Sequence, residues 1–129
     1  MGLGKTLQTL ALLCLRQKIG KPSLVVCPTS LLGNWADEAA RWAPQLSVQI
    51  MHGPQRKDLF KSISSVDVII TSYALVVRDL AEYQKLELNT LVLDEASVIR
   101  NPDTQSAKAL RKLNAGARVA MTGTPVENA

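Results

Sequence analysis

The sequence predicts an α/β fold in which helices cover both faces of a mainly parallel sheet. Segments with helical spacing and segments with strand character alternate along the whole chain. The strand-like segments are continuous apolar runs, which is typical of parallel strands buried on both faces. The chain has 129 residues, of which 47% are hydrophobic and only 4% aromatic. These values suit a single domain with an aliphatic core.

The N-terminal part predicts two helices separated by one strand. Apolar residues recur at helical spacing from Thr6 to about Lys18, and Gly20 is the expected C-cap. The apolar run Ser23–Cys27 is typical of a buried strand, and Pro28 stops it. A second helix is expected over Ser30–Trp42. Its stripe, interpreted as core rather than as a base-stacking surface, consists of Leu31, Leu32, Trp35, Ala39 and Trp42.

The middle of the chain predicts two strands around a short basic helix. Ser47–Met51 alternates as a strand does, and a turn follows at His52–Pro54. The helix is expected from Gln55 to about Ser62, and Val66–Thr71 is the next apolar strand. We interpret the helix cations as a solvated face, with contact to a DNA backbone as the less favoured alternative. These cations are Arg56, Lys57 and Lys61.

The C-terminal part predicts two helices and two strands in alternation. They cover Tyr73 to about Lys85, Thr90–Leu93, Thr104–Leu113 and Arg118–Met121. The first helix is expected to turn Leu75, Val76 and Leu80 inward. Asp103 is the expected N-cap of the second helix, and Gly116 follows its end.

Polar loops follow the predicted strands at four places. Parallel sheets bind ligands at the carboxyl ends of their strands, so these loops are expected to meet at one edge. They are Pro28–Ser30, Thr71–Tyr73, Asp94–Glu95 and Thr122–Thr124.

Charge and cysteine content narrow the class of protein. The net charge of +4 permits contact with a polyanion without requiring it. Cys14 and Cys27 have neither metal-ligand spacing nor a disulfide framework, and we interpret them as small buried apolar residues in a reducing, intracellular setting. No apolar run is long enough for a transmembrane helix, so we expect no contact with a membrane.

A Gly-Lys-Thr tripeptide near the N-terminus matches the end of a phosphate-binding loop. Gly4 lets the backbone approach a phosphate, Lys5 brings a positive charge to it, and Thr6 offers a hydroxyl to Mg²⁺. The first glycine of the pattern and the strand that delivers the loop would precede Met1. On its own, the tripeptide fits a solvated turn equally well.

Two carboxylates follow the apolar strand that ends at Leu93. An Asp such as Asp94 can bind Mg²⁺, and a following Glu such as Glu95 can accept a proton from an attacking water. The alternative is a solvated strand end with an acidic N-cap. Phosphoryl transfer to water needs a phosphate site, a metal and a base together, so the presence of Gly4–Thr6 in the same chain favours the catalytic interpretation.

Taken in order, these loops resemble the Swi/Snf-type helicase-like ATPases of helicase superfamily 2, DNA translocases that include chromatin remodellers. The resemblance extends over nearly the whole chain. Its pieces are Met1–Thr6 (motif I), Val25–Leu32 with Asn34–Trp35 (Ia), Ile70–Tyr73 (Ib), Leu93–Ala96 with Arg100–Pro102 and Thr104–Gln105 (II), and Ala120–Asn128 (III).

This resemblance implies a partial N-terminal RecA-like ATP-binding lobe over residues 1–129. The lobe would be a three-layer α/β/α P-loop domain without its first, P-loop strand. ATP and Mg²⁺ are the implied cofactors. The implied partners are duplex DNA, bound through its backbone without sequence specificity, and a second RecA-like lobe of the same polypeptide. That second lobe supplies arginine fingers, so we expect weak or no ATPase activity from this segment alone.

The resemblance also implies site residues. Gly2, Gly4, Lys5 and Thr6 would bind the ATP phosphates. Thr6 and Asp94 would bind Mg²⁺. Lys5 and Glu95 would be the catalytic residues. The DNA track and its link to the nucleotide would comprise Pro28, Thr29, Ser30, Thr71, Ser97, Thr122, Gly123 and Thr124. Ser97 stands where the family usually has His or Gln, which leads to the hypothesis that it weakens the coupling between ATP and DNA.

Two alternatives remain at this stage. One is a degenerate, non-hydrolysing module that binds DNA or protein, which Ser97 and the incomplete phosphate loop favour. The other is a different P-loop NTPase such as a kinase, which the motif Ia and III segments disfavour. The short spacing between motifs favours a bacterial protein of the cytoplasm or nucleoid, with the nucleus as the compartment of a eukaryotic one.

Overall fold

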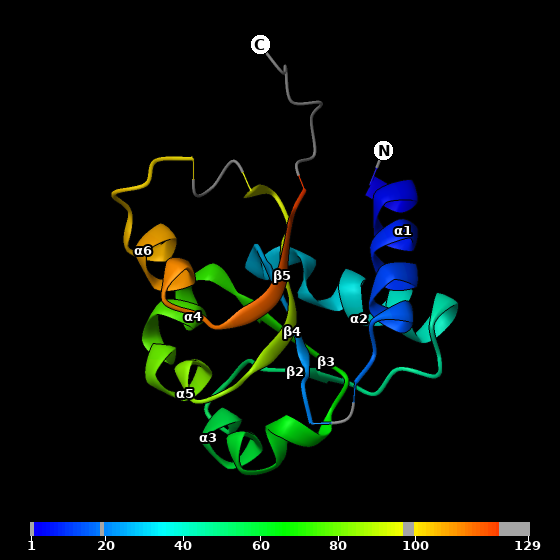
Figure 1. The fold of residues 1–129 in the computed structure, drawn as a ribbon, viewed down its shortest axis with the longest axis horizontal. Helices are drawn as coiled ribbons and strands as arrows, with labels where there is room; N and C mark the ends of the chain where they lie inside the picture. Colours follow the sequence, from blue (N-terminus) through cyan, green and yellow to red (C-terminus); the bar gives the residue numbers. More distant parts are fainter. Residues whose placement is uncertain (1, 19, 97–99, 122–129) are drawn as a thin grey trace.

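A computed structural model describes residues 2–18, 20–96 and 100–121, and its strands form one five-stranded sheet (Figure 1). The strands are β1 (Ser23–Cys27), β2 (Val48–Ile50), β3 (Val68–Ser72), β4 (Leu88–Leu93) and β5 (Ala115–Ala120). Their order is β2-β3-β1-β4-β5, and every neighbouring pair is parallel. The helices are α1 (Gly2–Leu15), α2 (Leu32–Trp42), α3 (Arg56–Leu59), α4 (Tyr73–Arg78), α5 (Leu80–Gln84) and α6 (Gln105–Arg111), with 3₁₀ turns η1 (Thr29–Leu31) and η2 (Phe60–Ser65).

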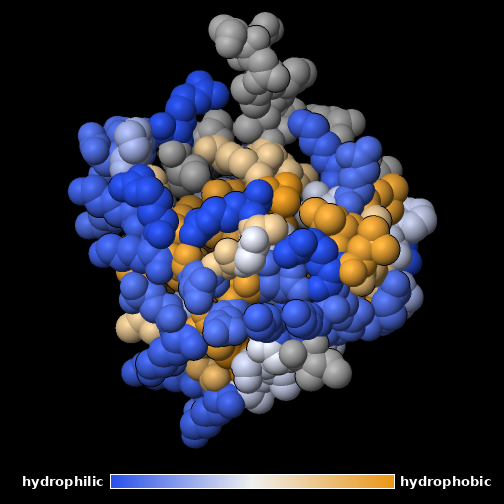
Figure 2. All heavy atoms as spheres, viewed as in Figure 1, coloured by the Kyte–Doolittle hydropathy of each residue, from blue (hydrophilic) through white to orange (hydrophobic). Residues whose placement is uncertain are grey.

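Helices cover both faces of the sheet (Figure 1). On one face, Leu10 of α1 and Trp35 of α2 pack in a core that includes Val25 of β1. On the other face, Leu110 of α6 packs in a second core that includes Leu24. Successive residues of β1 therefore point into opposite layers, which confirms the predicted three-layer α/β/α arrangement. Figure 2 shows hydrophilic side chains over the outer side of the layer that contains α4 and α6, as amphipathic helices require.

Several predicted boundaries were wrong. The first helix begins at Gly2 rather than Thr6, so the predicted phosphate-loop residues form its first turns. β5 begins at Ala115, because Leu88 of β4 pairs with Ala115, and Gly116 therefore lies inside the strand. Thr104, not Asp103, is the N-cap of α6. Its hydroxyl accepts a hydrogen bond from the Ala107 amide at 3.2 Å.

The interpretation of both tryptophans as core residues holds for only one of them. Trp35 is 3% exposed and belongs to the core between α2 and the sheet. Trp42 is 45% exposed, and its indole nitrogen donates to Glu38 Oε2 at 2.5 Å. Trp42 is the last residue of α2, where the buried stripe ends, while the Arg41 guanidinium lies 4.9 Å from its ring centroid. The apolar stripe is thus shorter than the sequence indicates.

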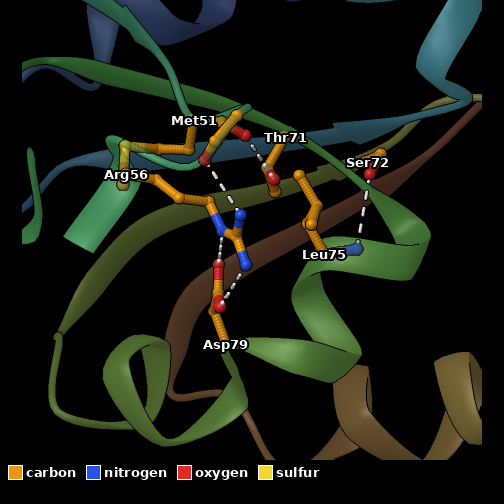
Figure 3. Close-up of polar contacts among 7 residues, drawn as sticks. Met51, Arg56, Thr71, Ser72, Leu75 and Asp79 are labelled. Carbon is orange, nitrogen blue, oxygen red and sulfur yellow. Dashed lines mark hydrogen bonds and ion pairs between the residues drawn. The ribbon is translucent and has the colours of Figure 1, made fainter.

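The predicted helix from Tyr73 to about Lys85 is broken at Asp79, where an ion pair forms (Figure 3). Arg56 Nε and Nη2 lie 2.6 and 3.2 Å from Asp79 Oδ2 and Oδ1. Both side chains are largely buried, at 16% and 13% exposure. The interpretation of Arg56 as a solvated cation was therefore wrong, whereas Lys57 and Lys61 are exposed as expected.

Among the described residues, none of the helices is long and apolar enough to cross a membrane.

Candidate functional site

The N-terminal end of α1 lies at the edge of the sheet where β4 and β5 end (Figure 1). Gly4 and Lys5 are exposed and Thr6 is half-buried in the first turns of this helix. A Cβ added to Gly4 would meet no atom within 4 Å, so protein packing does not require a glycine there. The Thr9 hydroxyl donates to the Lys5 carbonyl oxygen at 2.8 Å, four residues earlier in the same helix.

Asp94 is held through its backbone and its side chain by three different segments. Its amide donates to the Val26 carbonyl oxygen at 2.8 Å, which extends the pairing between β1 and β4. The Trp35 indole Nε1 donates to Asp94 Oδ2 at 2.8 Å. The Tyr73 hydroxyl donates to the Asp94 carbonyl oxygen at 2.6 Å. The following residue, Glu95, is half-buried and has a φ of 54°, in the left-handed region that few non-glycine residues adopt.

The Asp94 charge affects two buried neighbours. Burial, reinforced by the negative charge of Asp94, raises the pKa of the Cys27 thiol to about 12. Burial raises the pKa of Tyr73 as well, and the charge of Asp94 adds to that effect. Both side chains therefore stay protonated and neutral at physiological pH, and Tyr73 keeps the proton that it donates.

Met121 joins this site to the end of β5, which sequence reasoning missed. Its amide donates to the Leu93 carbonyl oxygen at 2.8 Å, and its carbonyl oxygen accepts from the Ala96 amide at 2.6 Å. The Thr9 hydroxyl lies 3.3 Å from the Met121 sulfur. One residue thus contacts α1, the end of β4 and the segment after Glu95.

The contacts of Trp35 and Tyr73 with Asp94 were also missed. The helical stripe correctly indicates that Trp35 is buried, but a stripe carries no information about the indole nitrogen. The chemistry of the two side chains could have indicated such contacts, because a buried indole N–H or phenol O–H usually has a hydrogen-bond partner.

The predicted DNA-track residues differ in exposure. Pro28 is half-buried, and Thr29 and Ser30 are exposed in η1. Thr71 is fully buried, and its hydroxyl donates to the Met51 carbonyl oxygen at 3.1 Å (Figure 3). A direct phosphate contact from Thr71 does not fit this structure, because the hydroxyl faces the interior. Ser97 and Thr122–Thr124 lie outside the described residues.

The parallel sheet, its two helical layers and the acidic pair at the carboxyl end of β4 define a RecA-like α/β domain. Residues 1–129 match the family model described as the SNF2-related domain, and the chain therefore belongs to that family.

The alignments with individual relatives include almost all of this chain but only a small share of each relative's length. YwqA of Bacillus subtilis is 41% identical over 99% of the chain and 14% of its own length. The TATA-binding protein-associated factor MOT1 and the ISWI chromatin-remodeling complex ATPase ISW2 of Saccharomyces cerevisiae are 39% and 38% identical over 99% of the chain, which spans 8% and 12% of their lengths. The solved Sulfolobus solfataricus SWI2/SNF2 ATPase core in complex with dsDNA has a TM-score of 0.88 and 41% identity, over 99% of this chain and 27% of that one.

Proposed function

We propose that this chain is the ATP-binding lobe of a DNA-dependent ATPase that moves along duplex DNA. The observation that carries the proposal is the pair Asp94 and Glu95 at the carboxyl end of β4, which Met121 connects to Thr9 of α1. Membership of the SNF2-related domain family supports it. The similarity to an ATPase core in complex with dsDNA supports duplex DNA as the track.

The residues at this edge fit Mg²⁺ chemically. Thr6 and Asp94 offer hydroxyl and carboxylate oxygens, the donor atoms that Mg²⁺ prefers. Within the described residues, no cluster of three His, Cys, Asp or Glu side chains could form a cage for a metal ion. Mg²⁺ usually keeps several waters and binds through one or two carboxylates together with substrate phosphates, so Asp94 and Thr6 with ATP would be a sufficient set of donors. When bound, Mg²⁺ would neutralise charge on the phosphates of ATP.

The other proposed roles belong to groups of this chain. The N-terminal end of α1, with Gly2, Gly4 and Lys5, would bind the phosphates, because a helix N-terminus and a lysine both favour anions. Glu95 would accept a proton from the attacking water. Its left-handed backbone turns the chain directly after Asp94, so the two carboxylates need not follow the alternation of a strand.

Contact with DNA is proposed for the turn after β1. Thr29 and Ser30 are exposed there, and their small hydroxyls suit contacts to phosphates, which position a duplex without reading its sequence. Thr122, Gly123 and Thr124 remain proposed as the link between nucleotide and DNA. Ser97 remains proposed as a residue that weakens this link, to be tested by restoring a longer side chain with Ser97→Gln.

The decisive experiment measures ATP hydrolysis by the full-length protein with and without duplex DNA. Glu95→Gln should retain ATP binding and lose at least about 100-fold in hydrolysis, because a positioned general base contributes about that much or more. Asp37→Asn, which removes an exposed carboxylate from α2, is the matched control and should hydrolyse ATP at the parent rate. A parent protein that binds DNA but releases no phosphate would instead be the non-hydrolysing module that Ser97 favours.

A further inference from the structure

Two aromatic side chains donate hydrogen bonds to Asp94 from separate segments of the chain. We propose that Trp35 and Tyr73 are positioning residues that orient Asp94 for a divalent cation. This inference rests on the proposed function, because it assigns a task to groups around the proposed Mg²⁺ ligand. It concerns how the carboxylate is held rather than which residue binds the ion.

Trp35 fixes the side chain of Asp94. Its indole nitrogen is a donor only, and it donates to Oδ2 at 2.8 Å. The ring is 3% exposed and packs in the core between α2 and the sheet, so the donor has little freedom to move. With Oδ2 tied to a fixed point, the direction in which Oδ1 points is restricted as well. A carboxylate held in this way does not need to be ordered when a cation arrives.

Tyr73 fixes the backbone of the same residue. It begins α4 directly after β3, is 6% exposed, and donates to the Asp94 carbonyl oxygen at 2.6 Å. That carbonyl belongs to the peptide that joins Asp94 to Glu95, where the chain turns into the left-handed region. The two donors together restrain both ends of Asp94, its side chain through Trp35 and its main chain through Tyr73.

The chain contains a matched aromatic residue for each donor. Trp42 lies on the same helix as Trp35, but its indole nitrogen donates to Glu38 at the surface. Tyr83 is buried, as Tyr73 is, but no hydrogen bond joins its hydroxyl to Asp94 within the part of the chain that the structure describes. Replacing any of the four by Phe removes a polar group and keeps an aromatic ring. Only two of the four replacements remove a bond to Asp94.

The test is a Mg²⁺ titration of nucleotide binding in the full-length protein. The probe is a fluorescent, non-hydrolysable ATP analogue, whose anisotropy reports binding without any turnover. Trp35→Phe should raise the half-saturating Mg²⁺ concentration about tenfold and Tyr73→Phe about threefold, since hydrogen bonds to charged groups are roughly twice as strong as neutral ones. Binding of the analogue in the presence of a chelator should stay within about twofold of the parent. Trp42→Phe and Tyr83→Phe should leave both quantities within about twofold.

Each other outcome has a defined meaning. The inference would be overturned if each variant had the same half-saturating Mg²⁺ concentration as its control, Trp35→Phe as Trp42→Phe and Tyr73→Phe as Tyr83→Phe. That result would leave the proposed function intact. An equal loss of binding with and without Mg²⁺ would assign the two residues to packing alone and would also overturn it. A parent protein that binds no nucleotide would overturn the proposed function and this inference with it. If Trp35→Phe fails to fold by circular dichroism, Tyr73→Phe decides the result, because it removes a single oxygen atom.

Discussion

At the scale of single residues, the two cysteines differ in a way that their spacing in the sequence does not reveal. Cys27 is fully buried at the end of β1, and burial together with the charge of Asp94 raises its pKa from 9.0 to about 12. Cys14 is half-buried on α1 and accepts a hydrogen bond from Gln45 Nε2 at 3.2 Å. At pH 8 we therefore expect iodoacetamide to modify Cys14 and to reach Cys27 only after unfolding, as measured by mass spectrometry with and without urea.

The same pKa shift predicts how stability depends on pH. The folded state holds the Cys27 proton more tightly than the unfolded state, so the thiol lowers stability only above the unfolded value of 9.0. From there toward pH 12 the free energy of unfolding should fall by about 1.4 kcal/mol per pH unit relative to Cys27→Ala. Parallel curves for the parent and Cys27→Ala in urea unfolding between pH 8 and 10 would contradict this.

The position of the acidic pair could be predicted from the sequence, while the roles of its two carboxylates stay predictions. Asp94 and Glu95 follow from an apolar strand that ends in two acids, and the structure holds Asp94 rigidly at that strand end. The link to Trp35 was not predictable in the same way, because it joins residues separated by 59 positions through one nitrogen atom. Thr71 shows the opposite error. A hydroxyl in a polar loop suggested a surface contact, but the last residues of β3 are buried.

At the scale of elements, the ion pair between Arg56 and Asp79 connects α3 to the break between α4 and α5 (Figure 3). The bond to Asp79 raises the pKa of Arg56, which stays charged. Asp79→Ala would leave that charge largely buried and without its carboxylate partner. We expect the free energy of unfolding to fall by about 2–3 kcal/mol, because an uncompensated, largely buried charge is costly.

Urea unfolding of Asp79→Ala and Glu82→Ala provides the comparison. Glu82 pairs with Lys85 at 3.6 Å, but both side chains are exposed, and such pairs contribute about 0–1 kcal/mol. Glu82→Ala should therefore change stability by less than about 1 kcal/mol. Neither hydrogen bond to Asp94, from Trp35 or from Tyr73, involves Arg56 or Asp79, so Asp79→Ala should leave nucleotide binding unchanged at temperatures where the protein is folded. If both variants lowered the free energy of unfolding equally, the buried Arg56–Asp79 pair would contribute no more to stability than the exposed Glu82–Lys85 pair.

Elements were predicted well in type and less well in extent. The run Ser23–Cys27 was predicted with its correct bounds, since Pro28 stops it and all five residues are buried. β4 and β5 both begin earlier than predicted. Their first residues pair with each other, Leu88 with Ala115, and this pairing lengthens both strands. At the break between α4 and α5, Asp79 pairs with Arg56, which lies 23 positions earlier. Local periodicity contains no such long-range information.

At the scale of the whole molecule, the sequence predicts layers but not strand order. Continuous apolar strands require helices on both faces, and Leu24 and Val25 do pack into opposite cores. The order β2-β3-β1-β4-β5 follows instead from which strands pair, and β1 lies between β3 and β4 although neither is next to it in the sequence. This order brings the ends of β1 and β4 together, so that Val26 accepts a hydrogen bond from the Asp94 amide.

The whole-molecule prediction concerns what the 129 residues do alone. The match to the solved ATPase core includes 99% of this chain but only 27% of the core. We propose, from the resemblance to two-lobed motors, that a second lobe supplies residues that complete the site around ATP. Arginine fingers in GTPases, which also hydrolyse a nucleotide on a phosphate-binding loop, increase the rate about 10³–10⁵-fold. We therefore expect the isolated chain to hydrolyse ATP at least about 1,000-fold more slowly than the full-length protein, with no stimulation by duplex DNA.

Phosphate release by both proteins at equal concentration, with and without DNA, measures this difference. Circular dichroism and cooperative urea unfolding of the isolated chain establish that it is folded before its rate is interpreted. Glu95→Gln in the isolated chain is the background control, because any remaining phosphate release in that variant does not come from the proposed site. A folded chain that matches the full-length rate would mean that Lys5, Thr6, Asp94 and Glu95 are sufficient for hydrolysis. The proposed second lobe would then serve movement along DNA rather than the chemistry of ATP.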